Sequence, residues 1–423
     1  MMTEDFLHFI WKFKTDGIDF QTPEGEIIRV VRPGEHNHDA GPDFLHARVS
    51  IGGTLWAGNV ELHVRSSDWL RHGHEKDDAY DNVILHVVYY HDLDISRKSG
   101  ELITTLALDG QLPAGIYDKY QHFLNNHLWI PCAMALSTVN EMVVKDWLTA
   151  LSVNRLERKC KELERLLDFT GNDWNQAFYQ SLAGTLGFRI NRQPFELLAR
   201  QTPAQFLEKH KDDIFQAEAI LFGQAGLLSG RFRGEYPKML KREYAHLRNK
   251  FSLHPVPGHL WKFLRLRPNN FPTIRIAQLA MITHQRVNLF GEIIEKSVRE
   301  EFCDLFQVGV SEYWKSHYYF DRPSREMNKS ISPSTVDLIL INNVVPFLFV
   351  YGKSKGLEHY CDRALRLLAS IPAESNAITR KYATFGITPV SADQSQALLE
   401  LKANYCDRKR CLECRIGVEL VAE

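Results

Sequence analysis

The chain has 423 residues, of which 44% are hydrophobic and 24% are charged, a composition typical of globular proteins. A chain of this length exceeds one ordinary hydrophobic core, so we expect two or three domains. The formal net charge of −1 excludes a field over the whole molecule that would attract nucleic acid, so any such surface must be a local patch.

The cysteine count and the apolar runs indicate the cellular compartment of the protein. Seven cysteines, an odd number in a large chain, fit a reducing cytoplasm better than a disulfide framework. The N-terminus has acidic residues before a short apolar run, unlike a secretory signal. The longest apolar run, residues 336–351, includes Asp337 and Asn342, which predicts a core helix or strand pair too short to span a membrane. We expect a cytoplasmic protein with no membrane partner.

The first third of the chain predicts a mixed α/β (α+β) domain over residues 1–130. An amphipathic helix over residues 5–14 precedes strand-like runs, and the pair Gly52-Gly53 predicts a hairpin turn between two of them. The expected strands cover residues 26–31, 44–51, 55–65, 82–90 and 101–107.

The remainder predicts a mainly helical domain over residues 131–370, followed by a segment of residues 371–423. Residues 141–167 carry apolar side chains at three- and four-residue spacing, the pattern of an amphipathic helix. Residues 371–395 predict a connector with a short β-like piece. A last helix, residues 394–405, leads into a cysteine-rich tail.

Histidines and carboxylates are concentrated between residues 36 and 91. Burying such groups is costly unless they are solvated, paired or bound to a cation, so a divalent-metal active site is the first hypothesis. Eight of the 18 histidines fall in this stretch: His36, His38, His46, His63, His72, His74, His86 and His91.

The strand over residues 57–65 predicts the centre of the site. Because side chains alternate along a strand, Glu61 and His63 share one face, opposite the apolar face of Val60 and Leu62. Asp43 opens the preceding strand, and the hairpin can bring it beside Glu61. Two carboxylates suit Mg²⁺ or Mn²⁺. A solvated strand edge is the alternative interpretation for Glu61 and His63.

Two further histidines follow this strand. In His72-Gly73-His74 the glycine allows both imidazoles to face one ion. With His63 or Asp78 they would form a zinc site with an open position, and an ordinary surface loop is the alternative. His86 lies in an apolar run, which predicts a buried core group or a partner that orients another side chain.

Gly41-Pro42-Asp43, the turn and Glu61-Leu62-His63 resemble the core of the PD-(D/E)xK nuclease superfamily. The resemblance implies an α-β-β-β-α-β core in which Asp43 and Glu61 bind metal. His63 stands where that superfamily has lysine, which puts the activity in doubt, and Lys76 is another source of an amine. The resemblance implies a Mg²⁺- or Mn²⁺-dependent nuclease or nuclease-like hydrolase. In our leading hypothesis His63 replaces the lysine, and His72 and His74 are auxiliary catalytic residues. The alternatives are a zinc-dependent hydrolase of a small substrate and an inactive nuclease fold that binds nucleic acid.

Over nearly its whole length, the chain also resembles an uncharacterised bacterial family of unknown function. The resemblance rests on several strings, and it implies an intact fold and a bacterial cytoplasm without naming a reaction. The strings are NHDAGPDF, WAGNVELHVRSSDW, AYDNVILHVV, RLRPNNFPTIRIAQLA and CDRKRCLECRIG.

A basic stretch in the helical domain predicts phosphate contacts from Arg265, Arg267 and Arg275. Pro272 predicts a helix N-terminus, whose free N–H groups attract anions. A solvated helical face, with the arginine stems packed on the core, is the alternative.

The tail predicts a second metal site. The spacing of Cys406, Cys411 and Cys414 allows chelation of one ion and is similar to three of the four cysteines of plant-type ferredoxins. Some PD-(D/E)xK nucleases also join one distant cysteine to three C-terminal ones around a cluster. Cys132 is the first candidate for the fourth ligand and Cys361 the second, with zinc or an iron–sulfur cluster as the group bound. Free thiols are the alternative.

Overall fold

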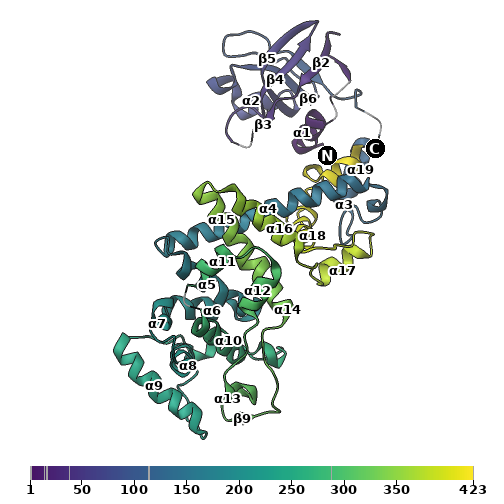
Figure 1. The fold of residues 1–423 in the computed structure, drawn as a ribbon. Helices are drawn as coiled ribbons and strands as arrows, with labels where there is room; N and C mark the ends of the chain where they lie inside the picture. Colours follow the sequence, from purple (N-terminus) through teal and green to yellow (C-terminus); the bar gives the residue numbers. More distant parts are fainter. Residues whose placement is uncertain are drawn as a thin grey trace. The chain divides into compact units, whose positions relative to one another are not determined.

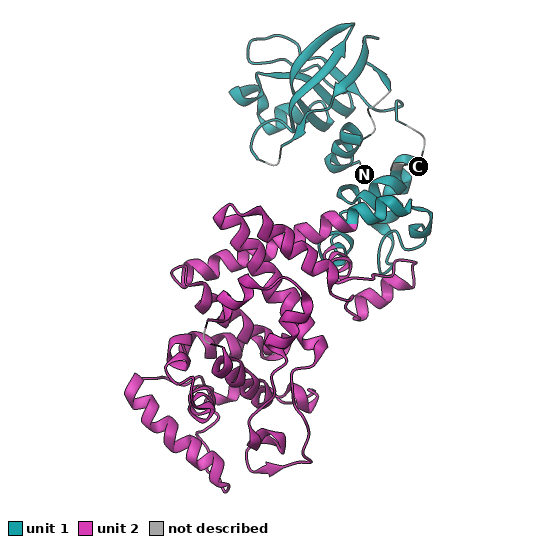
Figure 2. Cartoon of the chain, viewed as in Figure 1, with its two compact units in different colours: residues 1–147, 401–423 teal, residues 148–400 magenta. Residues whose placement is uncertain are grey.

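The computed structural model describes residues 2–13, 15, 18–37, 39–112, 115–286 and 288–422. Two residues of the predictions lie outside these ranges. They are His38, from the histidine-rich stretch, and Lys14, from the predicted first helix. The chain divides into two compact units, the first of residues 1–147 and 401–423 and the second of residues 148–400 (Figure 2). The tail therefore groups with the N-terminal part, whereas the sequence predicted a separate third segment.

Unit 1 is built on a curled, seven-stranded mixed sheet within its described residues (Figure 1). The order is β1-β2-β4-β5-β6-β7, with β3 paired to β4 outside this path. Neighbours from β1 to β5 are antiparallel, and β5–β6 and β6–β7 are parallel. The strands are β1 (Asp19–Gln21), β2 (Ile27–Arg32), β3 (Glu35–His36), β4 (Phe44–Ile51), β5 (Thr54–Arg65), β6 (Val83–Tyr90) and β7 (Thr105–Ala107).

Helices and short turns complete unit 1. The amphipathic helix α1 (Glu4–Phe13) buries Phe6, Leu7 and Ile10 and packs against β5. The other elements are α2 (Asp68–His72), η1 (His74–Lys76), η2 (Asp78–Tyr80), α3 (Ile116–Asn125), η3 (Leu136–Thr138), the start of α4 (Glu141–Phe169), the π-helical η7 (Leu401–Cys406), η8 (Cys411–Glu413) and α19 (Arg415–Ala422).

Two irregularities in the sheet determine where the site forms. The predicted turn at Gly52-Gly53 joins β4 to β5, and both glycines have positive φ angles of 57° and 87°. Farther along β4, Phe44 pairs with Val60 but Ala47 pairs with Gly58, so β4 contains one extra residue. Such a bulge re-aims the residues beside it. The bulge lies next to Asp43, which immediately precedes β4.

Unit 2 is helical apart from one small hairpin in its described part, formed by β8 (His317–Tyr319) and β9 (Arg322–Pro323). A continuous apolar core joins its helices. These are the rest of α4, α5 (Trp174–Leu186), α6 (Phe188–Gln201), α7 (Ala204–Glu208), α8 (Ile214–Gln224), α9 (Glu235–Phe251), η4 (Gly258–Leu260), η5 (Pro268–Asn270), α10 (Pro272–Gln285), α11 (Leu289–Glu295), α12 (Arg299–Phe306), α13 (Glu312–Lys315), α14 (Pro333–Ile339), the π-helical η6 (Leu340–Val344), α15 (Val345–Lys355), α16 (Glu358–Ser370), α17 (Ala377–Ala383) and α18 (Ala392–Glu400).

One helical stretch of the described chain, Pro333–Lys355, is long and apolar enough to cross a membrane by length and composition alone. Its length corrects the prediction from residues 336–351 that this segment is too short. In the structure 78% of its most apolar window is buried inside the protein, which is also what the core helix of a soluble protein shows.

The predicted connector over residues 371–395 contains a helix that the sequence analysis missed. The Asn376 side chain accepts the N–H groups of Ile378 and Thr379 and so caps α17. The β-like piece corresponds to a single bridge between Pro372 and Ser391. A short helix with one strong cap and little apolar periodicity is easily taken for a loop.

Candidate functional site

The polar face of β5 is buried. Glu61 is 5% exposed and His63 is 1% exposed, so the interpretation of this face as a solvated edge is wrong. The apolar face of Val60 and Leu62 is buried as predicted. A buried carboxylate beside a buried imidazole requires hydrogen bonds or a cation to offset desolvation.

Asp43 and Glu61 are joined by reciprocal contacts between their strands. The Asp43 N–H donates to Oε2 of Glu61 at 3.0 Å, and the Leu62 N–H donates to Oδ2 of Asp43 at 2.9 Å. Each carboxylate is thereby held by the backbone of the other's strand, as the hairpin geometry predicted. This arrangement fixes both carboxylates at the same end of the β4–β5 pair.

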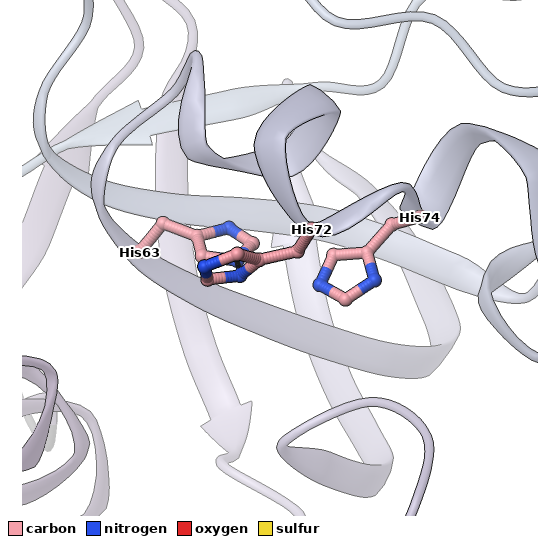
Figure 3. A group of neighbouring side chains, drawn as sticks. All are labelled: His63, His72 and His74. Carbon is pink, nitrogen blue, oxygen red and sulfur yellow. Dashed lines mark hydrogen bonds between the residues drawn. The ribbon is translucent and has the colours of Figure 1, made fainter.

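Three imidazoles gather beside Glu61. Nε2 of His63 lies 3.0 Å from Nδ1 of His72, and Nε2 of His74 lies 3.2 Å from Oε1 of Glu61. One ring nitrogen from each histidine falls in a group whose members all lie within 4.8 Å of one another. Figure 3 shows these three side chains, one from β5 and two from the α2–η1 segment, with their rings together. The three histidines could therefore hold a metal ion.

The segment after β5 is anchored so that His72 and His74 reach the sheet. The Asp92 carboxylate accepts hydrogen bonds from the hydroxyls of Ser66 and Ser67, at 3.0 and 2.8 Å. These bonds fix the turn into α2. Gly73 ends α2 with a φ of 77°, a left-handed conformation that glycine adopts without steric cost. The change of chain direction at Gly73 lets His72 and His74, on either side of it, both approach His63.

Aromatic rings restrict the second of these histidines. The His74 ring stacks on Tyr80 with centroids 3.8 Å apart and meets the edge of Trp69 at 5.4 Å. Trp69 is 1% exposed and also contacts the His86 ring. Packing of this kind fixes the orientation of an imidazole before any ligand arrives.

His86 orients His63. It is fully buried in β6, and its Nε2 lies 2.9 Å from Nδ1 of His63, in a hydrogen bond. This contact matches the predicted role of a partner that orients another side chain. Since His63 uses Nδ1 in this bond, Nε2 is the nitrogen that faces His72 and Glu61.

The buried imidazoles are neutral. Burial, reinforced by the neighbouring His86, lowers the pKa of His63 to about 2, and burial lowers the pKa of His86 to about 3. Burial also raises the pKa of Glu61, an effect that the hydrogen bond from His74 opposes. Neutral imidazole is the form that binds metal ions.

The distances also fit the coordination of a metal ion. Bonds of about 2.0–2.1 Å from a tetrahedral ion to nitrogen place neighbouring ligand atoms about 3.4 Å apart. Oε1 of Glu61 lies 3.2 Å from His74 Nε2 and 3.6 Å from His63 Nε2, and His63 Nε2 lies 3.0 Å from His72 Nδ1. Glu61 thus stands at coordination distance from two of the three imidazoles.

His8, which the sequence analysis missed, reaches the site from α1. Its Nε2 lies 3.2 Å from Oδ2 of Asp43, and its ring meets the ring of His36 at 5.0 Å. Burial lowers the pKa of His8, but the hydrogen bond and charge of Asp43 outweigh burial and raise it overall. The only signal in the sequence was a polar residue on the apolar face of an amphipathic helix.

Lys76, the other predicted source of an amine, faces solvent. Its side chain is 83% exposed, and its Nζ lies 3.3 Å from Oε1 of Glu75. Among the described residues, the carboxylates of Asp43 and Glu61 contact imidazoles and backbone N–H groups. Histidine is therefore the side chain that can bring positive charge to these carboxylates.

The predicted phosphate-binding arginines lie in unit 2 and differ from one another. Arg265 and Arg267 are exposed, and α10 begins at Pro272 as predicted. Arg275 is 4% exposed and donates to Gln278 at 2.8 Å and to Asn270 at 2.7 Å. The Arg275 guanidinium therefore braces the fold, and a phosphate contact stays a prediction for the two exposed arginines.

The cysteines of unit 1 are close without being a closed metal site. Cys411 and Cys414 are buried, and burial together with these two thiols raises the pKa of Cys132 to about 12. None of the seven cysteines, all within the described residues, forms a disulfide. Among the described residues, no three cysteine sulfurs lie within 4.8 Å of one another. Zinc or an iron–sulfur cluster at Cys132, Cys406, Cys411 and Cys414 stays a prediction.

Residues 4–377 match the model of the family described as "Protein of unknown function (DUF2851)". The chain belongs to this family. The DUF2851 match includes the whole cluster from His8 to His86 and ends before Cys406, Cys411 and Cys414. No curated protein and no solved structure matches the chain significantly.

Proposed function

We propose that this DUF2851 protein is a metal-dependent hydrolase that cleaves phosphodiester bonds in nucleic acid. The observation that carries the proposal is the group of three imidazoles, from His63, His72 and His74, beside the carboxylate pair Asp43 and Glu61. Imidazole nitrogens and paired carboxylates that meet at one point, partly buried and partly open to solvent, are typical of a divalent-metal centre.

The order of elements supports a nuclease-like core. When the short strands β1 and β3 and the turns η1 and η2 are left out, α1, β2, β4, β5, α2 and β6 follow the helix–strand–strand–strand–helix–strand order of the PD-(D/E)xK core. Asp43 precedes the second of these strands, and Glu61 and His63 lie on the third, where that superfamily has its acidic residue and its lysine. This correspondence favours nucleic acid as the substrate.

The donor set favours Mn²⁺ over Mg²⁺. Carboxylates suit both ions, whereas imidazole is a poor ligand for the hard Mg²⁺. When bound, the metal would supply Lewis acidity and an acidified water molecule. Glu61, His63, His72 and His74 would hold the ion, and Asp43 would hold it or a water beside it.

In this proposal His8 supplies part of the positive charge that the lysine provides in the PD-(D/E)xK superfamily. Its raised pKa and its position 3.2 Å from Asp43 favour the protonated ring near the reacting centre. A protonated imidazole can stabilise negative charge developing on a phosphate, and it can donate a proton to the leaving oxygen. His63, whose ring is neutral, would not supply that charge.

A zinc-dependent hydrolase of a small substrate is the second candidate. Three donor-atom distances favour it, because they are close to the separation that tetrahedral zinc needs: 3.0 Å for His63–His72, 3.2 Å for His74–Glu61 and 3.6 Å for His63–Glu61. The metal that restores activity to stripped protein, and the substrate class, separate the two candidates.

We also propose a structural metal at Cys132, Cys406, Cys411 and Cys414, either zinc or an iron–sulfur cluster. Its support is the convergence of the Cys132 thiol on Cys411 and Cys414 from a distant part of the sequence. Metal analysis of protein purified without oxygen tests it. One zinc ion or an iron–sulfur absorption band, lost in Cys411→Ser, would support the site. The absence of both from the parent protein would refute it.

Cleavage of labelled DNA and RNA by metal-stripped protein, with Mn²⁺, Mg²⁺ or Zn²⁺ added back, tests the main proposal. We expect Mn²⁺ to restore activity, and Asp43→Asn and Glu61→Gln to lower it at least about 100-fold. His91→Ala is the matched control, because His91 lies in the same stretch but pairs with Asp94. Absence of cleavage with every metal, or equal loss in the control, would refute the proposal.

A further inference from the structure

A cleft of about 680 Å³ opens in unit 1 along α1. Its walls come from α1, from His36 in β3, from α3 and from residues 408–413 near the C-terminus. The three histidines and Glu61 that would hold the metal ion do not line this space. The cleft has the volume of a typical small-ligand site, which suits a few nucleotides of a single strand and does not enclose a duplex.

The walls of the cleft carry more positive than negative charge. Four of its residues are lysine or arginine, namely Lys12, Arg408, Lys409 and Arg410, whereas its acidic residues are Asp5 and Glu413. A cleft of this sign attracts a phosphate-bearing ligand and concentrates it between low-dielectric walls.

Two of the four cations are already engaged. Arg410 forms a two-point ion pair with Glu413, and Lys409 donates to the backbone carbonyls of Leu124 and Asn126. Lys12 and Arg408 are exposed, and among the described residues neither has an ion pair within 4 Å. Two cations from distant parts of the chain thus face one cleft with their charges available.

The same cleft offers an aromatic face. Phe13 is 43% exposed although it ends a helix whose other aromatic residues are buried. The Lys12 ammonium lies 5.3 Å from the centre of the Phe13 ring. Exposed aromatic rings beside cations are the usual way in which proteins bind single-stranded nucleic acid, because bases stack on the ring while phosphates meet the charges.

The cleft is continuous with the metal site through two histidines. His8 and His36 line the cleft, and His8 also lies 3.2 Å from the Asp43 carboxylate. The His36 ring stacks on Phe44, the residue after Asp43, with centroids 4.8 Å apart. A nucleic-acid strand lying in the cleft would therefore pass beside Asp43.

We propose that this cleft binds a segment of single-stranded nucleic acid, with Lys12 and Arg408 on the phosphates and Phe13 stacked on a base, and directs it to Asp43. The inference rests on the proposed nuclease function, for which it names the substrate class. A duplex would have to open before it could enter.

Binding in EDTA separates this inference from catalysis, since no cleavage occurs without metal. Fluorescence anisotropy of a labelled oligothymidine would be followed against the full chain, the double variant Lys12→Ala/Arg408→Ala and Phe13→Ala. The control is Lys119→Ala/Arg48→Ala, which removes two exposed cations from α3 and β4 that do not line the cleft. Melting temperatures would verify that each variant is folded.

We expect the cleft double variant to weaken binding at least about tenfold and the control by less than about twofold. The slope of log K against log salt should fall by about 1.4, because each phosphate contact on a single strand contributes about 0.7. Phe13→Ala should weaken binding about fivefold or more. A blunt-ended duplex should bind more weakly than the single strand.

Failure of the inference differs from failure of the proposed function. Equal losses in the cleft and control variants, or tighter binding of duplex, would overturn the inference even where Mn²⁺-dependent cleavage is observed. Cleft-dependent binding without cleavage by any metal would refute the nuclease proposal and leave the cleft as a binding site. No binding of the oligothymidine by the full chain would overturn the inference.

Discussion

His63 and His72 lie with Nε2 and Nδ1 3.0 Å apart, although one comes from the buried C-terminal half of β5 and the other from a short helix after it. Without a cation, this contact is a hydrogen bond between the two rings that competes with metal binding. Its energetic effect is modest, because a hydrogen bond typically contributes about 1 kcal/mol net. A divalent ion bound by both nitrogens would readily replace this hydrogen bond. The same placement of the two rings therefore fits the metal-free and the metal-bound protein.

The orienting role of His86 is testable through metal affinity. We expect His86→Leu to weaken Mn²⁺ binding about 10- to 100-fold, because the hydrogen bond that fixes the His63 ring is lost. Calorimetric titration of metal-stripped protein measures the effect, with His91→Ala as the control. Unchanged affinity in a folded His86→Leu variant would show that His63 needs no such partner.

Glu61 should stabilise the fold in the absence of metal. Glu61→Ala removes the acceptor of the Asp43 N–H and the partner of His74, which we expect to cost about 1–3 kcal/mol. Glu61→Gln keeps an acceptor at nearly the same place and should recover most of this loss. Urea unfolding in EDTA measures both variants, and equal stability of Glu61→Ala and the parent protein would argue against the contacts described.

Gly58 should be needed for the close approach of β5 to β6. A Cβ at this position would lie 2.4 Å from Cγ2 of Ile84 and 2.7 Å from the carbonyl oxygen of Asn82. We expect Gly58→Ala to destabilise the protein by about 1–3 kcal/mol and to lower metal affinity through the adjacent strand. Gly309→Ala is the control, because nothing lies within 4 Å of its added Cβ.

A buried glutamate in unit 2 gives a pH prediction that is independent of the metal. Glu218 is fully buried in α8 and accepts a hydrogen bond from the Tyr236 hydroxyl, and burial raises its pKa from 4.5 to about 7. The folded state therefore binds more protons than the unfolded state between these values. The contribution of Glu218 to stability is therefore largest below about pH 4.5, and it falls by about 3 kcal/mol as the pH rises through 7.

Glu218→Gln should remove this dependence. We expect the variant to match the parent protein near pH 4.5 and to be more stable at pH 8, with a difference that grows with pH in between. Chemical unfolding at several pH values provides the measurement. A difference in stability that stays constant with pH would mean that Glu218 titrates normally.

Local patterns predicted most of the sheet and the centre of the site. The alternation of β5 and the Gly52-Gly53 turn placed Asp43, Glu61 and His63 together, because strand geometry depends on neighbouring residues. His8 was missed since it arrives from α1 through tertiary packing. The burial of Arg275 was missed for the same reason: its partners Gln278 and Asn270 satisfy it only once the helix has formed.

The cleft was also beyond prediction from sequence. Lys12 and Arg408 are almost 400 residues apart, and the tail was expected to form a segment of its own. No periodicity within either segment indicates that the two face one space. Only the contacts that group residues 401–423 with the sheet reveal it.

Calorimetric titration of metal-stripped protein with Mn²⁺ tests the central claim most directly, since thiolates are poor ligands for this ion and the cysteines will not obscure the result. We predict one ion bound per chain in the parent protein, and none in the triple variant His63→Ala/His72→Ala/His74→Ala at the same concentrations. Stoichiometric binding that survives in the folded triple variant, or no binding by the parent protein, would contradict the assignment of the metal centre.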